Sequence, residues 1–195
     1  LNAVAYEKIT AQAITKLSAP IESGDCKIVF LNPIKPHDPI GTKGTDMNNN
    51  SIVFRLSCPS FSKSSFLFTG DIENKAMATL LDQTLLQSDI LKVPHHGSKG
   101  SLQDQFLNRV SPKIAIFSVG ERNRYRHPHP KVVEAYEKIG AKIYRTDQQG
   151  AITVILNAGG FGVESFYEGK MKKVQFGRSM LLQEIENLKK GFSIQ

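Results

Sequence analysis

The chain has 195 residues, of which 40% are hydrophobic, which is enough for one packed domain with a short appendage. Its formal net charge of +7 permits binding to an acidic partner such as nucleic acid but does not establish it. No apolar run is long enough to cross a bilayer and no signal-peptide pattern is present, so we expect no membrane contact by this chain itself. Cys26 and Cys58 have no C-x-x-C spacing, so we expect two ordinary strand residues that leave the redox compartment open.

The spacing of apolar residues predicts strands and helices in alternation along the chain. Expected strands cover residues 26–31, 51–56, 65–69, 89–93, 113–119, 141–145, 151–156, 163–167 and 171–176. Expected helices cover residues 3–17, 73–87, 101–109, 130–140 and 178–190, with Ser101 capping the third, and residues 33–50 form a long loop. Such alternation, with hairpins among the strands, indicates an α/β or α+β layered fold.

Two polar motifs follow neighbouring strands of this pattern. Asp71 ends the run Phe68-Thr69-Gly70-Asp71, and His95 and His96 lie in the run from Val93 to Ser98. One complete helix–strand unit separates them, and such a unit returns the chain to the same edge of a sheet. Carboxylate oxygen and imidazole nitrogen are ligands for a divalent metal, which can ionise a water for attack on a phosphate or carbonyl. The pattern predicts a metal-dependent hydrolase, whereas the simpler alternatives are a helix cap at Asp71 and an exposed turn at the histidines.

A basic segment precedes the fourth expected helix. It contains three arginines, one tyrosine and two histidines, namely Arg122, Arg124, Arg126, Tyr125, His127 and His129. Arginine offers forked donors to phosphate, tyrosine offers a stacking face, and a helix N-terminus attracts anions. The alternative is a solvated basic loop in which His129 caps the helix.

Three further residues are candidates for substrate contact. Asn50 and Ser51 form a turn by composition, and their amide and hydroxyl groups can orient a substrate or a water. Ser98 can cap a turn or donate to a phosphate oxygen, and Gly97 lets the backbone approach a ligand closely.

The motifs from about Asp25 to Val154 resemble the second half of a metallo-β-lactamase-fold domain. They are most similar to the domain at the end of the ComEC competence (DNA uptake) family, through Phe68-Thr69-Gly70-Asp71, the segment 92–98, the segment 125–130 and the segment 146–150. The resemblance implies an α+β fold, an αββα sandwich with a zinc or manganese site at one edge of its two sheets. It implies that Asp71 reaches both metal positions and that the pair of histidines supplies one imidazole, for which we favour His95 over His96. His127 and His129 would then lie near the substrate.

The chain departs from that family in two places. The family's H-x-H-x-D-H-like motif occurs nowhere in the sequence, and Asn50 and Ser51 stand where many relatives have a metal-binding histidine. We therefore expect residues 1–160 to be the C-terminal part of such a domain, which is incomplete and inactive alone, and residues 161–195 to be an unassigned hairpin and helix. An incomplete sandwich is expected to sit against its N-terminal half or a second copy.

The resulting hypothesis is a metal-dependent phosphodiesterase or nuclease in competence-type DNA uptake. Asp71 and His95 would be catalytic, and the arginines would hold the DNA backbone. One alternative is a catalytically inactive module that binds DNA or a partner, and another is a soluble hydrolase of a small phosphoester or ester. The resemblance implies the extracytoplasmic face of a bacterial membrane for a ComEC-type protein and the cytoplasm for a stand-alone relative.

Overall fold

The computed structural model describes residues 13–34, 45–60, 62–167 and 170–176. Within these ranges it contains a seven-stranded sheet, a three-stranded sheet and a set of short helices. None of the helices in the described part of the chain is long and apolar enough to span a membrane.

The seven strands of the large sheet lie side by side in the order in which they follow along the chain. Strands β1 to β4 pair antiparallel, and strands β4 to β7 pair parallel. The bounds are β1 (Ile21–Ser23), β2 (Cys26–Asn32), β3 (Val53–Cys58), β4 (Ser62–Phe68), β5 (Ile90–Lys92), β6 (Ile114–Phe117) and β7 (Lys142–Arg145). Because β4 to β7 share one direction, their carboxyl ends meet at one edge of the sheet.

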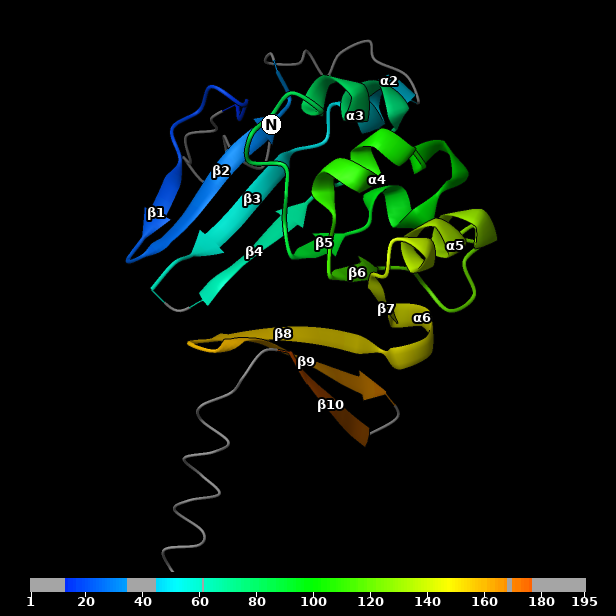
Figure 1. The fold of residues 1–195 in the computed structure, drawn as a ribbon. Coiled ribbons are helices and arrows are strands. Elements are labelled where there is room, and N and C mark those ends of the chain that lie inside the picture. The colour runs from blue at the N-terminus through cyan, green and yellow to red at the C-terminus, as the bar shows by residue number, and fades with distance from the viewer. Residues whose placement is uncertain (1–12, 35–44, 61, 168–169, 177–195) are drawn as a thin grey trace, which may run out of the picture.

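The connections between the parallel strands contain helices that cover one face of the large sheet (Figure 1). They are α3 (Asn74–Leu80), the 3₁₀ turns η1 (Pro94–Gly97) and η2 (Lys99–Ser101), α4 (Asp104–Val110) and α5 (Pro130–Lys138). Two further short helices are α2 (Thr45–Asn49) before β3 and α6 (Thr146–Gln149) after β7.

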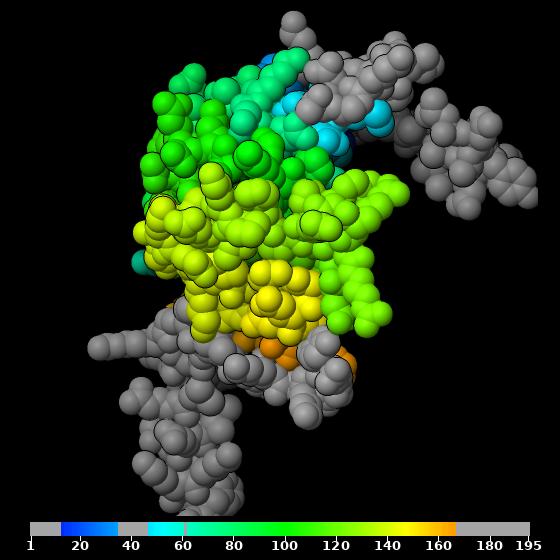
Figure 2. Space-filling view, turned by 90° about the vertical axis from the view of Figure 1, so that its right-hand side faces the viewer, coloured from blue at the N-terminus to red at the C-terminus, as the bar shows by residue number. Residues whose placement is uncertain are grey.

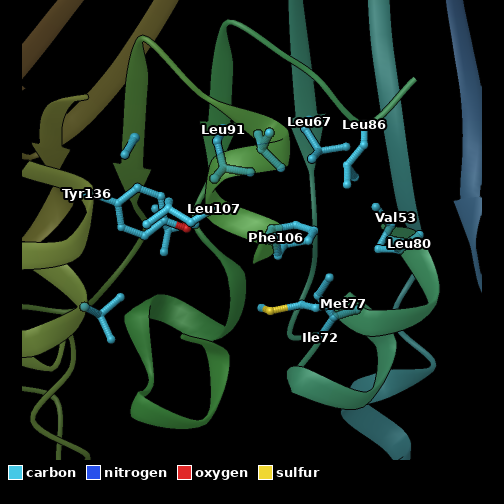
Figure 3. Close-up of a cluster of buried hydrophobic side chains, with 14 of the residues drawn as sticks. Val53, Leu67, Ile72, Met77, Leu80, Leu86, Leu91, Phe106, Leu107 and Tyr136 are labelled. Atoms are coloured by element: carbon cyan, nitrogen blue, oxygen red, sulfur yellow. The ribbon is translucent and has the colours of Figure 1, made fainter. Parts of the chain in front are cut away.

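The main hydrophobic core lies between these helices and the sheet. Phe106 of α4 points into the middle of the cluster, between Leu91 of β5 and Met77 of α3 (Figure 3). All three side chains are essentially inaccessible to solvent. Burial of large apolar side chains is the main stabilising contribution to such a layer, so this core holds the strand ends in place.

The second sheet packs against the opposite face of the large sheet (Figure 1). It consists of β8 (Ala151–Asn157), β9 (Gly160–Tyr167) and β10 (Lys170–Phe176), paired antiparallel. A smaller core with Ile90, Ile114, Tyr144, Phe161 and Val163 fills the space between the two sheets. Neighbours in β5 point to opposite faces, since Ile90 faces the second sheet and Leu91 faces the helices.

The architecture agrees with the α+β class expected from the sequence. It has three layers within the described residues, a helical layer followed by two sheets. A second helical layer, which an αββα sandwich requires, is not among the described residues. Of the helix expected over residues 3–17, the part before residue 13 lies outside the described part of the chain, and so does the helix expected over residues 178–190.

Several element boundaries differ from the expectation. The loop expected over residues 33–50 contains the helix α2, and residues 13–17 are not helical. The helix expected over residues 73–87 ends at Leu80, because the polar residues Asp82 and Thr84 favour the turn that follows. Ser101 does not cap α4 but donates from its buried hydroxyl to the carbonyl of Pro94, and α4 begins after Gln103.

The expectation of two separate thiols is wrong, because Cys26 and Cys58 form a disulfide. Cys26 begins β2 and Cys58 ends β3, and the antiparallel register pairs their neighbours Lys27 and Ser57. Two residues separated by 32 positions in the chain therefore lie side by side. Sequence spacing alone carries no sign of this pairing, which depends on the strand register.

Candidate functional site

The polar residues singled out by the sequence gather at the carboxyl ends of the parallel strands. Asp71 follows β4, His95 and His96 follow β5, and the basic loop (residues 120–129) follows β6. The amide N–H of His95 donates to the carbonyl of Gly70 over 3.1 Å, which joins the first two turns directly. The expected gathering at one sheet edge is what the structure shows.

The turn that carries Asp71 is fixed by a neighbouring serine. The Oγ of Ser51 accepts a hydrogen bond of 3.0 Å from the amide N–H of Asp71. Gly70 has a φ of +55°, and a Cβ at this position would lie 2.6 Å from the Cβ of Ser51. Only glycine fits this close approach, so the Thr-Gly-Asp motif sets the direction of the carboxylate.

The turn that carries the two histidines is strained. His95 and His96 have φ values of +45° and +56°, and Gly97 follows with +80°. A Cβ on Gly97 would lie 2.6 Å from the Cβ of Pro128 and 2.8 Å from the ring of Phe117. Non-glycine residues in this conformation cost on the order of 1–3 kcal/mol each and persist where the surrounding structure holds them, most often at functional sites.

The two imidazoles of this turn face different carboxylates. The Nδ1 of His96 lies 2.5 Å from the carbonyl oxygen of Ser118, and its Nε2 lies 3.5 Å from Oδ1 of Asp71. A carbonyl can only accept, so Nδ1 carries the proton and a neutral His96 turns the lone pair of Nε2 toward the carboxylate. Two electron-rich atoms at this separation call for a shared cation or a second proton on the ring.

His95 contacts a glutamate that the sequence analysis did not single out. Its Nδ1 lies 3.1 Å from Oε1 of Glu73, a pair without good hydrogen-bond alignment, so the buried Nδ1 has no hydrogen bond. Asn48 donates to the same Oε1 over 3.2 Å. The side-chain oxygen of Asn49 accepts from the amide groups of Glu73 and Ala76, which holds the start of α3. The role of α2 is therefore to position Glu73 beside His95.

Lys92 is a second residue of the site that sequence reasoning missed. Its ammonium donates to the carbonyl of Gly70 over 3.1 Å and lies 3.8 Å from Oδ1 of Asp71. Burial lowers the pKa of Lys92, and the neighbouring Asp71 carboxylate opposes that shift. The feature of the sequence that points to Lys92 is its charge, because it is the polar residue at the end of an otherwise buried strand.

The arrangement fits part of a divalent metal site. Zinc bonds of about 2.0–2.2 Å at tetrahedral angles leave two ligand atoms roughly 3.4 Å apart. The 3.5 Å between His96 Nε2 and Asp71 Oδ1 matches this value, and a ligating histidine commonly donates its other N–H to a carbonyl, as His96 does. Among the described residues, no group of three or more His, Cys, Asp or Glu side chains is arranged to hold a metal. Two ligands fit, and a complete site needs more.

The other predicted substrate residues have mixed positions. Ser51 is engaged in holding Asp71, and the Oγ of Ser98 accepts from the amide N–H of Gly100, as a cap. Asn50 is half-buried in the turn after α2. The ring of His129 accepts from the amide N–H of Lys131 at the start of α5, so the cap alternative holds for this residue.

The basic loop projects from the side of the molecule, beside the residues that follow β7 (Figure 2). Its three arginines, Arg122, Arg124 and Arg126, are exposed. The side chain of Asn123 closes the loop, because it donates to the carbonyls of Gly120 and His127 and accepts from the amide N–H of His127. The loop therefore has a fixed base and a cationic surface.

A pocket of about 560 Å³ lies between the basic loop and the turn before β8. Its walls include both rings of a stacked pair, Tyr125 and His127, whose centroids are 5.8 Å apart. His96 also lines it, so one side chain of the pocket wall is also the one that faces Asp71. Burial and the neighbouring imidazoles lower the pKa of His127, and Asp71 opposes this shift.

The sequence of this chain is similar to parts of longer known proteins. It is 33% identical over 153 residues to ComE operon protein 3 of Bacillus subtilis, which covers 78% of this chain and 18% of that protein. It is 36% identical over 124 residues to competence protein ComA of Neisseria gonorrhoeae, and the match covers 63% of this chain and 18% of that protein. It is 37% identical over 92 residues to recombination protein 2 of Haemophilus influenzae, and the match covers 47% of this chain and 12% of that protein.

These similarities support a competence-related protein family. No known protein-family profile matches the chain. The chain spans less than a fifth of the length of the curated relatives it matches, so the similarity concerns one part of those proteins.

Proposed function

We propose that this chain forms part of a metallo-β-lactamase-type hydrolase that cleaves DNA phosphodiesters during competence-type DNA uptake. The observation that carries the proposal is the geometry at His96. Its Nε2 lies 3.5 Å from Oδ1 of Asp71 while its Nδ1 is fixed by the carbonyl of Ser118. The similarity to competence proteins and the layers of helices and sheets support the same assignment.

Different side chains of the site would bind the metal ion, add positive charge and hold the DNA. Asp71 and His96 would hold a zinc or manganese ion, with His95 as the alternative imidazole from the sequence analysis. When bound, such an ion lowers the pKa of a water and neutralises charge on the phosphate. Lys92 is 3.8 Å from Oδ1 of Asp71 and supplies a second positive charge beside the phosphate. The arginines of the basic loop would hold the DNA backbone.

The test is a cleavage and binding experiment on the full-length protein that carries this chain. Asp71→Asn keeps the shape of the side chain but removes its charge. We expect DNA cleavage to fall by at least about a thousandfold, because a metal supplies several kcal/mol of transition-state stabilisation. DNA affinity measured in EDTA should change little. Asp82→Asn, an exposed carboxylate in the turn after α3, is the matched control. Normal cleavage by Asp71→Asn overturns the proposal.

The second candidate is a catalytically inactive module that binds DNA or a partner. The observation in its favour is that the described residues contain no group of three potential metal ligands. It predicts DNA binding without cleavage in the presence of zinc or manganese. A hydrolase of small phosphoesters, the third alternative from the sequence, predicts turnover of bis(p-nitrophenyl) phosphate without cleavage of DNA.

A further inference from the structure

We infer that the pocket beside the Asp71 centre binds one unpaired nucleobase, so that the substrate of this site is single-stranded DNA. The inference rests on the proposed function and specifies its substrate. The pocket and the centre share His96, whose Nε2 faces Asp71 and whose ring also forms part of the pocket wall. A nucleotide whose phosphate lies at the centre would therefore have its base within reach of the pocket.

An aromatic ring is the main feature of this pocket. Tyr125 is 64% exposed, which is unusual for a large aromatic side chain that has a fixed place in the fold. Its ring stacks on His127 at an interplanar angle of 17°, and Asn123 fixes the backbone of His127. The ring is therefore held in place before any ligand arrives, and a largely exposed aromatic side chain of this kind is where single-stranded DNA stacks its bases.

Cationic groups border the same ring. The guanidinium of Arg124 lies over the ring of Tyr125, 4.7 Å from its centroid, and donates to the Tyr125 hydroxyl. Arg122 and Arg126 are exposed on the same loop. A base can stack on an arginine plane as well as on an aromatic ring, and arginine also binds the phosphates on either side. The combination of one ring and several guanidinium groups matches a nucleotide better than it matches an uncharged apolar ligand.

Most of the other residues that line the pocket are small, which leaves room for a flat ligand. They include Ser118, Gly120, Thr146, Gly150 and Ala151. A Cβ added at Gly120 would meet no atom within 4 Å, so this position borders open space. The volume of about 560 Å³ lies within the range of small-ligand pockets, about 300–1,000 Å³. A base in a duplex is stacked between neighbours and paired, so it cannot enter unless it leaves the helix.

The experiment measures binding of fluorescent oligonucleotides to the full-length protein in EDTA. The probes are a single-stranded oligonucleotide, the same length of abasic sugar-phosphate chain, and a duplex. We expect Tyr125→Ala to weaken binding of the single strand by roughly 5- to 150-fold, the loss that one stacked base predicts. Tyr125→Phe, which keeps the ring, should bind within about twofold of the wild type.

A second variant tests the pocket without touching the ring. Gly120→Leu fills the open space and should weaken binding of the single strand, but not of the abasic chain or the duplex. Unchanged binding of the single strand by both Tyr125→Ala and Gly120→Leu overturns the inference. An equal loss for the abasic chain also overturns it, because the residues would then act on the backbone.

The assay separates this inference from the proposed function. Binding in EDTA does not depend on hydrolysis, so the base-specific loss can be observed in a protein that cleaves nothing. That result would retain the base pocket and reject the nuclease. Cleavage that depends on Asp71 without any base-specific loss would retain the nuclease and reject the pocket.

Discussion

The η1 turn and the basic loop follow neighbouring strands, yet they are held in different ways. In η1, His95, His96 and Gly97 all have positive φ, and the position of a Cβ on Gly97 is already occupied by Pro128 and Phe117. In the basic loop Arg126 is the non-glycine residue with positive φ, the three arginines are exposed, and hydrogen bonds from the side chain of Asn123 close the loop.

This difference suggests that η1 positions groups for the reaction, whereas the basic loop binds the charged polymer. A group that must meet a reacting atom needs a fixed position, which packing and backbone strain supply in η1. A group that attracts a charged polymer needs exposure and charge, and tolerates small movements. The comparison can be tested by substituting corresponding residues in the two segments.

The largest effect is expected from a pair of glycine variants, one in each segment. Gly97→Ala places a Cβ against Pro128 and Phe117 at a positive φ and should lower the free energy of unfolding by at least about 1–3 kcal/mol. Gly120→Ala enters open space and should change it by less than about 0.5 kcal/mol. Urea unfolding measures both values, and equal losses would remove the contrast between the two segments.

A smaller effect is expected from the charges of the basic loop. Changing Arg122, Arg124 and Arg126 together to alanine should reduce the slope of log affinity against log salt by about 2 for single-stranded DNA, since each phosphate contact contributes about 0.7. The control replaces Lys27, Lys63 and Lys113, which lie at the opposite edge of the sheet, and should leave the slope unchanged. An unchanged slope in the arginine variant would mean that the loop is only a solvated surface.

A small effect on overall stability is expected from Asn123→Ala. It removes the hydrogen bonds that close the basic loop, but the loop contributes little to the core, so unfolding should shift by about 1 kcal/mol or less. Trypsin should nevertheless cut after Arg122, Arg124 or Arg126 faster than in the wild type, because the exposed loop opens locally. Unchanged cleavage rates would show that other contacts hold the loop.

The sequence pattern predicted that Asp71 and His95 gather at one sheet edge, on the condition that their strands share one direction, and it did not predict the strand order. The separation of Asp71 and His95 by one helix–strand unit was sufficient, because such a unit returns to the same sheet edge. The pattern did not resolve which histidine faces Asp71, since that depends on two positive φ angles in consecutive residues. The sequence favoured His95, whereas the structure places His96 at the carboxylate, and the ligand itself stays a prediction.

The spacing of residues in the sequence could not predict which side chains support the site. Glu73 stands near His95 only because α2 packs Asn48 and Asn49 against the start of α3. Asn123 lies between arginines in the sequence, so the pattern indicated a charged segment, whereas the role of Asn123 is to form hydrogen bonds within the loop. Such contacts depend on the positions of segments far apart in the chain, which periodicity does not report.

The disulfide between Cys26 and Cys58 links the site to the chemistry of its surroundings. The bridge closes a loop that contains α2 and Ser51, and so it contains the groups that hold Glu73 and Asp71. Disulfides persist in oxidising compartments and are rare where glutathione and thioredoxin keep thiols reduced. We therefore expect reduction of the bridge to loosen the segment that holds Glu73 and Asp71, so that the site depends on the redox state of its compartment.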